Sequence, residues 1–351
     1  MKSKKLSNKI LKSIKSKGFN NITLDPVIET KYILQRSGEN LKRFLFSFYD
    51  SNGKELCLRP DLTISSALRF IQNKKYRKEK IYYNGEAFRK TYQKKDSIIK
   101  NQIGYEILGS KNQQEDDKEI IETSLKILKD SGFKKSVLKI GNVELFNLLI
   151  NKLDIPKRWK NRLKRYYWNE SYFNELLKRL ETNSDIDPVF VDTDKSRYQK
   201  MRKENQNKIV AGRTFKEVLD RFNMKIEDPR SSSTGKKNTN IIKQFLKIRC
   251  PLKEAPKVLN KFFKKNKINI IVGEGFFPLN KNNNKNLKVE FSAANGREVE
   301  FYSSMIFSID VKIKSKFKNF ISGGRYDELT SNLGFKKVSA VGAAVNMDLY
   351  E

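Results

Sequence analysis

Residues 102–109 read Gln-Ile-Gly-Tyr-Glu-Ile-Leu-Gly, a stretch in which polar and apolar positions alternate. Alternation with a period of two is typical of a β-strand, and it places Gln102 and Glu106 on one face, opposite Ile103 and Tyr105. A sheet face that packs into a core is normally apolar, so polar side chains on it need a ligand or solvent to satisfy them. The stretch therefore predicts a strand that carries part of a binding site.

Short β-rich runs recur in the first and last parts of the chain. They span residues 44–49, 55–58, 80–83, 103–108, 268–272 and 305–309. Asn52 and Gly53, between the first two runs, are a strong signal for a two-residue turn, so we expect these two strands to form an antiparallel hairpin. A helix is expected over residues 4–18, where apolar residues fall on one helical face and Gly18 marks the end.

Between these parts lies a charged, helix-patterned block. Within it, residues 228–240 are rich in Ser, Asn, Gly and Lys, and we expect them to form a loop. β-rich segments on both sides of a helical block indicate one α+β domain that is interrupted by an inserted module. We predict a discontinuous domain of residues 1–152 and 267–351, with residues 153–266 as the helical insertion.

Charge is the most unusual feature of the composition. Of 351 residues, 73 are Lys or Arg and 40 are Asp or Glu, so the formal net charge is +33. A strongly basic chain is typical of proteins that bind polyanions. The lysines are spread over nearly every predicted surface, however, and accompany many Asn and Ile residues, which indicates a compositional bias equally well. Both interpretations stay open, and a specific nucleic-acid partner is not expected.

Missing residue types exclude several classes of protein. Histidine is absent, which removes the usual general base and the most common metal ligand. The two cysteines, Cys57 and Cys250, lie far apart and outside any Cys-x-x-Cys pair, so neither a metal site nor a disulfide framework is expected. The chain has no apolar run of about 18 residues and no signal segment. We therefore expect a cytoplasmic protein with no membrane, metal or cofactor requirement.

Four more segments place polar side chains beside predicted strands. Residues 58–63 read Leu-Arg-Pro-Asp-Leu-Thr and pass from a strand into a helix, where Asp61 would also be favourable simply as a charge at the helix N-terminus. Residues 82–89 read Tyr-Tyr-Asn-Gly-Glu-Ala-Phe-Arg. Residues 296–304 read Gly-Arg-Glu-Val-Glu-Phe-Tyr-Ser-Ser, and residues 322–329 read Ser-Gly-Gly-Arg-Tyr-Asp-Glu-Leu, which alone is an ordinary turn signal.

In their order and spacing, these segments resemble the signature motifs of histidyl-tRNA synthetases, which are class II aminoacyl-tRNA synthetases, and the resemblance covers nearly the whole chain. It implies a class II synthetase-like α+β fold, with a mostly antiparallel sheet flanked by helices. It also implies a histidine pocket, formed by Asp61, Thr63, Arg89, Gln102, Glu106, Arg297, Tyr302 and Tyr326. In such a pocket Asp61 and Glu106 would receive the α-ammonium or an imidazole N–H. Either arginine would pair with the carboxylate, and the tyrosines would wall the ring.

The resemblance weakens where a synthetase binds ATP. Residues 341–350 resemble the third class II motif, but Leu349 stands where an arginine holds a nucleotide phosphate. A leucine cannot donate the charge-assisted hydrogen bonds that a triphosphate needs. The second motif loses its Phe-Arg-x-Glu pattern at Thr91, and the chain stops at Glu351, where a synthetase would continue into an anticodon-binding domain. These departures favour a paralogous family, the regulatory subunits of short-form ATP phosphoribosyltransferase.

That family implies a non-catalytic protein in the first step of histidine biosynthesis. Such a subunit would sense histidine as a feedback inhibitor and activate the short-form catalytic subunit. The two would assemble as a hetero-octamer of four regulatory and four catalytic chains, built on regulatory dimers. Two alternatives stay open: a degenerate synthetase paralogue that binds tRNA, and an enzyme that activates an amino acid by itself.

Overall fold

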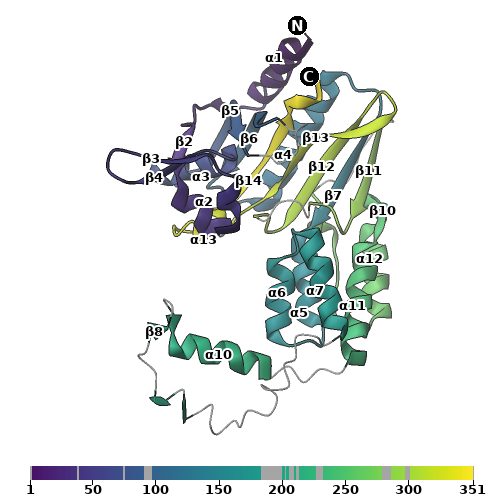
Figure 1. The fold of residues 1–351 in the computed structure, drawn as a ribbon. Coiled ribbons are helices and arrows are strands. Elements are labelled where there is room, and N and C mark those ends of the chain that lie inside the picture. The colour runs from purple at the N-terminus through teal and green to yellow at the C-terminus, as the bar shows by residue number, and fades with distance from the viewer. Residues whose placement is uncertain are drawn as a thin grey trace. The chain divides into compact units, whose positions relative to one another are not determined.

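The computed structural model describes residues 2–37, 39–73, 76–90, 97–182, 200–201, 203–204, 209–210, 213–226, 232–278, 286–296 and 301–350. The chain forms two compact units (Figure 1). The first unit comprises Met1–Glu144, Arg249–Leu259 and Val272–Glu351, and the second comprises Leu145–Ile248 and Asn260–Ile271. The first unit contains the segments that the sequence analysis singled out.

A nine-stranded sheet forms the centre of the first unit. Its strands, in spatial order, are β1 (Asn20–Asn21), β5 (Glu79–Phe88), β6 (Ile99–Leu108), β14 (Ala340–Asn346), β13 (Lys316–Arg325), β12 (Met305–Ile313), β7 (Ser136–Asn142), β11 (Leu287–Ser292) and β10 (Arg249–Pro251). Neighbouring strands are antiparallel except at β1–β5 and β11–β7. The predicted α+β fold with a mostly antiparallel sheet is confirmed, and strands distant in sequence, such as β6 and β14, lie side by side (Figure 1).

A second, three-stranded sheet in the same unit contains β2 (Val27–Glu29), β4 (Glu55–Leu58) and β3 (Ser47–Tyr49). The β3–β4 pair is antiparallel, as the Asn52-Gly53 signal predicted, but the expected two-residue turn is wrong. The Asp50 N–H donates to the Lys54 carbonyl, which leaves a three-residue loop. Gly53 has a φ of +74°, a left-handed conformation that favours glycine. The Asp50 carboxylate accepts the backbone N–H groups of Asn52 and Lys54, each at 2.9 Å, and so holds the turn from within.

Helices of the first unit cover both faces of the nine-stranded sheet, with α3 (Leu62–Gln72) and α4 (Gln113–Ser131) packed against it. The unit also contains α1 (Lys2–Lys15), α2 (Thr30–Ser37), α13 (Leu329–Asn332) and the short 3-10 helices η1 (Glu39–Phe44), η2 (Leu252–Glu254), η3 (Glu274–Phe276) and η4 (Met347–Tyr350). Ser66 of α3 bonds Glu106, whereas Ser124 of α4 bonds the hydroxyl of Tyr105. Because neighbouring residues of a strand point to opposite faces, α3 and α4 lie on opposite sides of β6.

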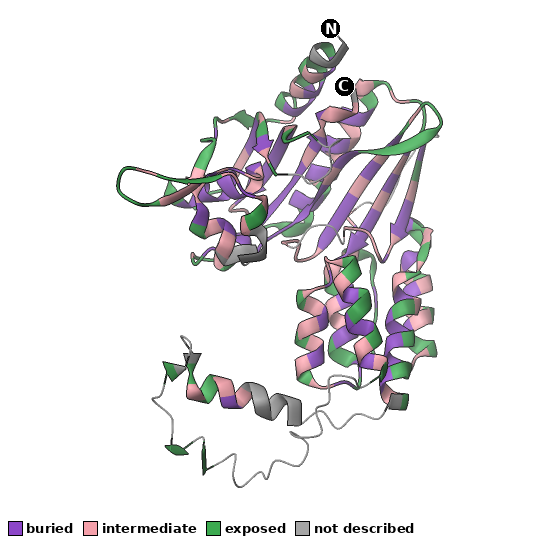
Figure 2. Cartoon of the chain, viewed as in Figure 1, coloured by how far each residue is buried: buried purple, intermediate pink, exposed green. Residues whose placement is uncertain are grey.

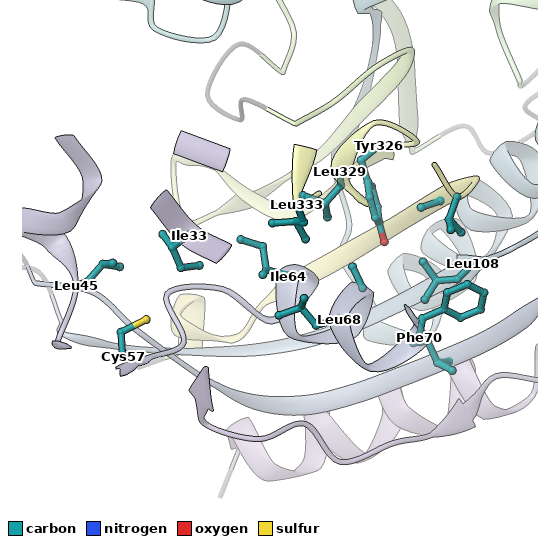
Figure 3. Close-up of a cluster of buried hydrophobic side chains, with 14 residues drawn as sticks. Ile33, Leu45, Cys57, Ile64, Leu68, Phe70, Leu108, Tyr326, Leu329 and Leu333 are labelled. Atoms are coloured by element: carbon teal, nitrogen blue, oxygen red, sulfur yellow. The ribbon is translucent and has the colours of Figure 1, made fainter. Parts of the chain in front are cut away.

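The apolar core on the α3 side surrounds the predicted site. Figure 3 shows Leu329 and Leu333 facing Ile64 and Leu68 of α3, with Tyr326 beside them. All five side chains are buried. Buried residues also run along the strands of the nine-stranded sheet (Figure 2). The predicted N-terminal helix is confirmed as α1, and Gly18 follows it with a φ of +78°.

The second unit is mainly helical. It contains α6 (Lys157–Arg165), α7 (Glu170–Thr182), α10 (Phe215–Ile226) and α11 (Ser232–Leu246), most of α5 (Val143–Lys152), part of α12 (Ala255–Lys265), and the two-residue strands β8 (Ile209–Val210) and β9 (Arg213–Thr214). Its core is aromatic: Phe146 stacks on Tyr167 at a centroid distance of 4.0 Å and contacts Phe173 edge-on. Edge-on and offset contacts of this kind stabilise a core beyond its buried area.

Two predictions about this part of the chain were wrong. Residues 232–240, expected as a loop, belong to α11, while 228–231 lie outside the described residues. Their small and polar side chains serve helix contacts. Asn238 donates to the carbonyls of Thr234 and Asp154, and a Cβ on Gly235 would lie 2.1 Å from the Leu180 carbonyl oxygen of α7.

The second error concerns residues 268–272, expected as a strand, which have no strand structure. Their first backbone groups end α12 instead. Ile268 N–H donates to the Phe263 carbonyl at 2.9 Å, and Lys267 takes a left-handed conformation with a φ of +56°. This is the usual geometry of a helix C-terminus, so apolar side chains here do not indicate a strand.

Candidate functional site

Glu106 is the centre of the polar cluster that β6 carries on its α3 side. It is 1% exposed. Its carboxylate accepts the hydroxyl of Tyr83 on β5 at 2.8 Å and also that of Ser66 on α3. Burial raises the pKa of Glu106 from 4.5 to about 7, and the hydrogen bonds from Ser66 and Tyr83 oppose that rise. Among the described residues, the groups that bond this carboxylate are hydroxyls, and none of them is a cation.

Glycines let these side chains come together. A Cβ on Gly104 of β6 would lie 2.3 Å from the ring of Tyr83, and a Cβ on Gly342 of β14 would lie 2.6 Å from Cγ of Glu106. Both distances are far shorter than any normal contact between carbon atoms. The glycine at position 104 is therefore what allows the Tyr83 ring to lie flat over β6 and reach Glu106.

Three aromatic side chains lie on the other side of Glu106. Tyr326, just after β13, meets Phe301 edge-on at 5.6 Å, and Phe301 meets Tyr302 at 5.1 Å. Burial, followed by the negative charge of Glu106, raises the pKa of both Tyr302 and Tyr326. The buried Tyr326 hydroxyl makes no hydrogen bond of good geometry among the described residues, but it lies close enough to Glu106 to lower the pKa of that carboxyl. Tyr326 therefore belongs to the same polar cluster as Ser66 and Tyr83.

The other predicted site residues are placed differently. Thr63, in the first turn of α3, lies close enough to favour the ionised form of Glu106 and so lower its pKa. Asp61 is the N-cap of α3 and accepts the Ile64 N–H at 2.9 Å. Arg89 is exposed, and its Nε donates to the Pro60 carbonyl at 2.7 Å.

Gln102 is partly buried on β6, and Arg297 lies outside the described residues. The structure thus gathers Thr63, Glu106, Tyr302 and Tyr326 into one cluster. Sequence reasoning missed Tyr83 and Ser66, whose hydroxyl groups donate hydrogen bonds to Glu106. Ser66 did give a signal, because it lies four residues from both Leu62 and Phe70 and so shares the side of the predicted helix that carries these apolar residues.

A second polar cluster fixes the end of β13, directly before Tyr326. Arg325 is 2% exposed and pairs with Asp117 of α4 and with Asp327. Its Nη1 also donates to the Ser339 hydroxyl and its Nη2 to the Gln113 carbonyl, each at 2.9 Å. Gly323 and Gly324 lie inside β13, and the turn that this segment signalled falls after the strand, at Asp327 and Glu328. The arginine network ties the strand to α4 and thereby positions Tyr326.

The segment that resembles the third motif ends in η4. Asp348 accepts the Asn101 N–H at 3.3 Å and pairs with Lys100 at 3.5 Å, both on β6. Leu349 is partly buried beside it and contributes no hydrogen-bond donor from its side chain. The acid of this segment is therefore used to bind the neighbouring strand, and Thr91 of the second motif lies outside the described residues.

The model of the family described as histidyl-tRNA synthetase matches residues 1–224 of this chain. The chain belongs to the histidyl-tRNA synthetase family. Curated members similar to it include the ATP phosphoribosyltransferase regulatory subunit of Rhizobium meliloti (strain 1021), 24% identical over 95% of this chain and 92% of that protein. The protein of that name from Allorhizobium ampelinum is 26% identical over 93% of this chain and 91% of its own length.

Solved structures of the family have the same fold. An ATP phosphoribosyltransferase regulatory subunit/histidyl-tRNA synthetase from Bacillus halodurans C superposes with a TM-score of 0.58 at 19% identity, over 99% of this chain and 78% of that one. A histidine–tRNA ligase subunit from Alicyclobacillus acidocaldarius gives 0.56 at 17% identity, over 99% and 91%. The predicted class II synthetase-like fold is confirmed. Among the described residues, no helix is long and apolar enough to cross a membrane.

Proposed function

We propose that this chain is the regulatory subunit of an ATP phosphoribosyltransferase and acts in histidine biosynthesis. The curated relatives that carry this name align over more than nine-tenths of the chain. The third-motif segment supports the same conclusion, because Leu349 offers no donor to a nucleotide phosphate and Asp348 is paired with Lys100. The chain therefore forms no aminoacyl-adenylate and acts on a separate, short-form catalytic subunit.

The same proposal includes histidine as the ligand of the Glu106 cluster. The observation that carries it is a buried carboxylate bonded only by hydroxyl groups among the described residues, with the rings of Tyr302 and Tyr326 beside it. A buried carboxylate without a cation favours a ligand that brings one. Glu106 accepts the α-ammonium or an imidazole N–H, and the tyrosines flank the ring. The remaining contacts come from Asp61, Thr63, Arg89, Gln102 and Arg297.

Regulation then requires histidine to bind two states of the assembly with different affinity. A difference of about 1–3 kcal/mol is typical of such coupling. The assembly we propose contains four regulatory and four catalytic chains and is built on dimers of the regulatory chain. Histidine shifts it toward the state in which the catalytic subunit is slow.

The test is reconstitution with a purified short-form catalytic subunit. The complex is expected to transfer the phosphoribosyl group to ATP faster than the catalytic subunit alone, and added histidine is expected to slow it. The chain by itself is expected to catalyse no histidine-dependent pyrophosphate exchange. Exchange above a no-protein control, or a catalytic rate that the chain leaves unchanged, would overturn the proposal.

RNA binding is a second candidate function, favoured by α6. This helix has six Lys or Arg and no acid among its nine residues. Trp159 is fully buried, so its ring anchors the helix, and the guanidinium groups of Arg158 and Arg162 lie over it at 5.3 and 5.5 Å from its centroid. Clustered cations are what the phosphate backbone of a nucleic acid contacts. The spread of lysines over the rest of the chain makes this the weaker of the two proposals.

A further inference from the structure

A cavity of ≈ 410 Å³ lies in the first unit, beside the edge of the nine-stranded sheet. Its lining comes from the end of α1, the segment that follows β1, the start of α3 and the middle of β5. Besides two tyrosines, the polar residues in the lining are Lys15, Asn21, Thr23, Arg59 and Asn84. No Asp or Glu of the described chain lines it. The volume is within the range of small-molecule sites.

Arg59 is the charged group that is built into this cavity. It is 7% exposed, so more than nine-tenths of the side chain is buried. Its Nε donates to the Glu86 carbonyl at 2.8 Å, and its Nη1 donates to the Leu24 carbonyl at 2.5 Å. These bonds to two backbone segments fix the plane of the guanidinium group.

The third nitrogen of Arg59 is left available. Nη2 has no hydrogen-bond partner among the described residues. It does not belong to the fully buried polar atoms that lack a partner, so it is accessible from outside. A Cβ at position 85 would lie 2.7 Å from Nη2, so the glycine there leaves room for this group. The available N–H groups thus face the cavity from a rigid support.

No carboxylate of the described residues forms an ion pair with Arg59. Asp25 and Glu86 lie near enough to favour its charged form, but burial is the larger effect and lowers the pKa of the guanidinium. A guanidinium stays charged under any ordinary condition, so the charge is buried without a counter-ion. Buried charges are normally paired, because removing them from water is costly.

We propose that this cavity binds the anionic group of a small ligand, a phosphate or a carboxylate, on the Nη2 side of Arg59. Guanidinium groups held in a fixed plane recognise such oxyanions by charge-assisted hydrogen bonds. Lys15 adds a second positive charge at the exposed rim, and Asn84 and Thr23 add polar side chains. The site is separate from the Glu106 cluster, although the Tyr83 ring lines the cavity and its hydroxyl bonds Glu106.

The experiment titrates the full chain with inorganic phosphate and with acetate by calorimetry. The buffer contains about 0.15 M potassium chloride, so that loose attraction to the basic surface is screened. Arg59→Lys and Lys15→Ala test the two cations. Lys12→Ala is the control, because Lys12 is exposed in the last turn of the same helix but does not line the cavity.

One of the two probes is expected to bind saturably at one site, and the tighter one identifies the ligand class. Arg59→Lys is expected to weaken it about 10- to 150-fold, and Lys15→Ala about 2- to 5-fold. Lys12→Ala is expected to bind as the wild type does. If Arg59→Lys does not fold, the comparison of Lys15→Ala with Lys12→Ala decides. No saturable binding, or equal affinity in those two lysine variants, overturns the proposal.

Discussion

Replacing Glu106 with glutamine removes one negative charge from the centre of the cluster and changes its volume little. The glutamine carbonyl still accepts the Tyr83 hydroxyl, and its amide group faces the Ser66 hydroxyl, which can accept as well as donate. The fold is therefore expected to persist. Two quantities should change: the dependence of stability on pH, and the affinity for histidine.

The change in stability follows from the pKa of Glu106, which burial raises from 4.5 to about 7. Between these two pH values the folded chain keeps a proton that the unfolded chain has released, so the wild type loses stability as pH rises through this window. At 1.36 kcal/mol per pH unit the loss is about 3 kcal/mol. Glu106→Gln is expected to lack it, so that its free energy of unfolding falls less between pH 5 and 8 than that of the wild type.

The change in histidine affinity is measured at pH 8, where the Glu106 carboxylate is mostly ionised. Loss of one charge-assisted hydrogen bond costs about 1.5–3 kcal/mol, which is about a 10- to 150-fold weaker affinity. Calorimetry and inhibition of the reconstituted phosphoribosyltransferase give two independent readings. Glu254→Gln, an exposed carboxylate in the same unit, is the control.

Two results would refute two separate steps, the assignment of histidine to this cluster and the raised pKa of Glu106. Equal histidine affinity in wild type and Glu106→Gln would mean that histidine is sensed elsewhere, whatever the stability data show. If the free energy of unfolding changes with pH between 5 and 8 by the same amount in Glu106→Gln as in the wild type, the Glu106 carboxylate is not held in a low-dielectric environment. The activity of the mutant complex without histidine should stay close to that of the wild type.

Three further predictions test other parts of the structure. Gly104→Ala places a methyl group against the Tyr83 ring and is expected to destabilise the fold by about 1–3 kcal/mol in a urea titration; an unchanged midpoint would contradict the packing described. Arg325→Met leaves Asp117 buried without its partner and is expected to cost about 3–5 kcal/mol at pH 8, so a loss below 1 kcal/mol would count against the network. RNA binding, measured by filter retention, is expected to be indifferent to sequence and to weaken steeply with salt, and tight tRNA binding at physiological salt would favour the alternative function.

The alternation in residues 102–109 was enough to predict β6 and the inward position of Glu106, because a period of two leaves only two faces to choose from. Asn52 and Gly53 predicted the β3–β4 hairpin correctly but not its turn, which has three residues instead of two and a positive φ at Gly53 and not at Asn52. The partners of Glu106 were not predictable in this way. Ser66 and Tyr83 reach it from two different elements, α3 and β5. How closely these elements approach depends on glycines such as Gly104, and the pattern of neighbouring residues does not show why a glycine is needed there.

The errors have a common cause. Residues 232–240 were expected as a loop because small polar residues favour loops, yet in α11 they lie where a neighbouring helix comes close. Residues 268–272 are β-branched and apolar apart from Asn269, yet they follow a helix C-terminus and pair with no strand of the described chain. Tertiary contacts outweigh intrinsic propensity in both places, and a single sequence does not report those contacts.

The two outermost strands of the large sheet, β1 and β10, are its shortest members. The first contains only two asparagines and the second ends in Pro251, which has no N–H to donate. Long exposed strand edges invite other chains to add strands, which leads to aggregation. Neither β1 nor β10 offers more than a few backbone groups to an added strand. An assembly of this protein that uses these two strands is therefore expected to rest on side-chain contacts and not on strand addition.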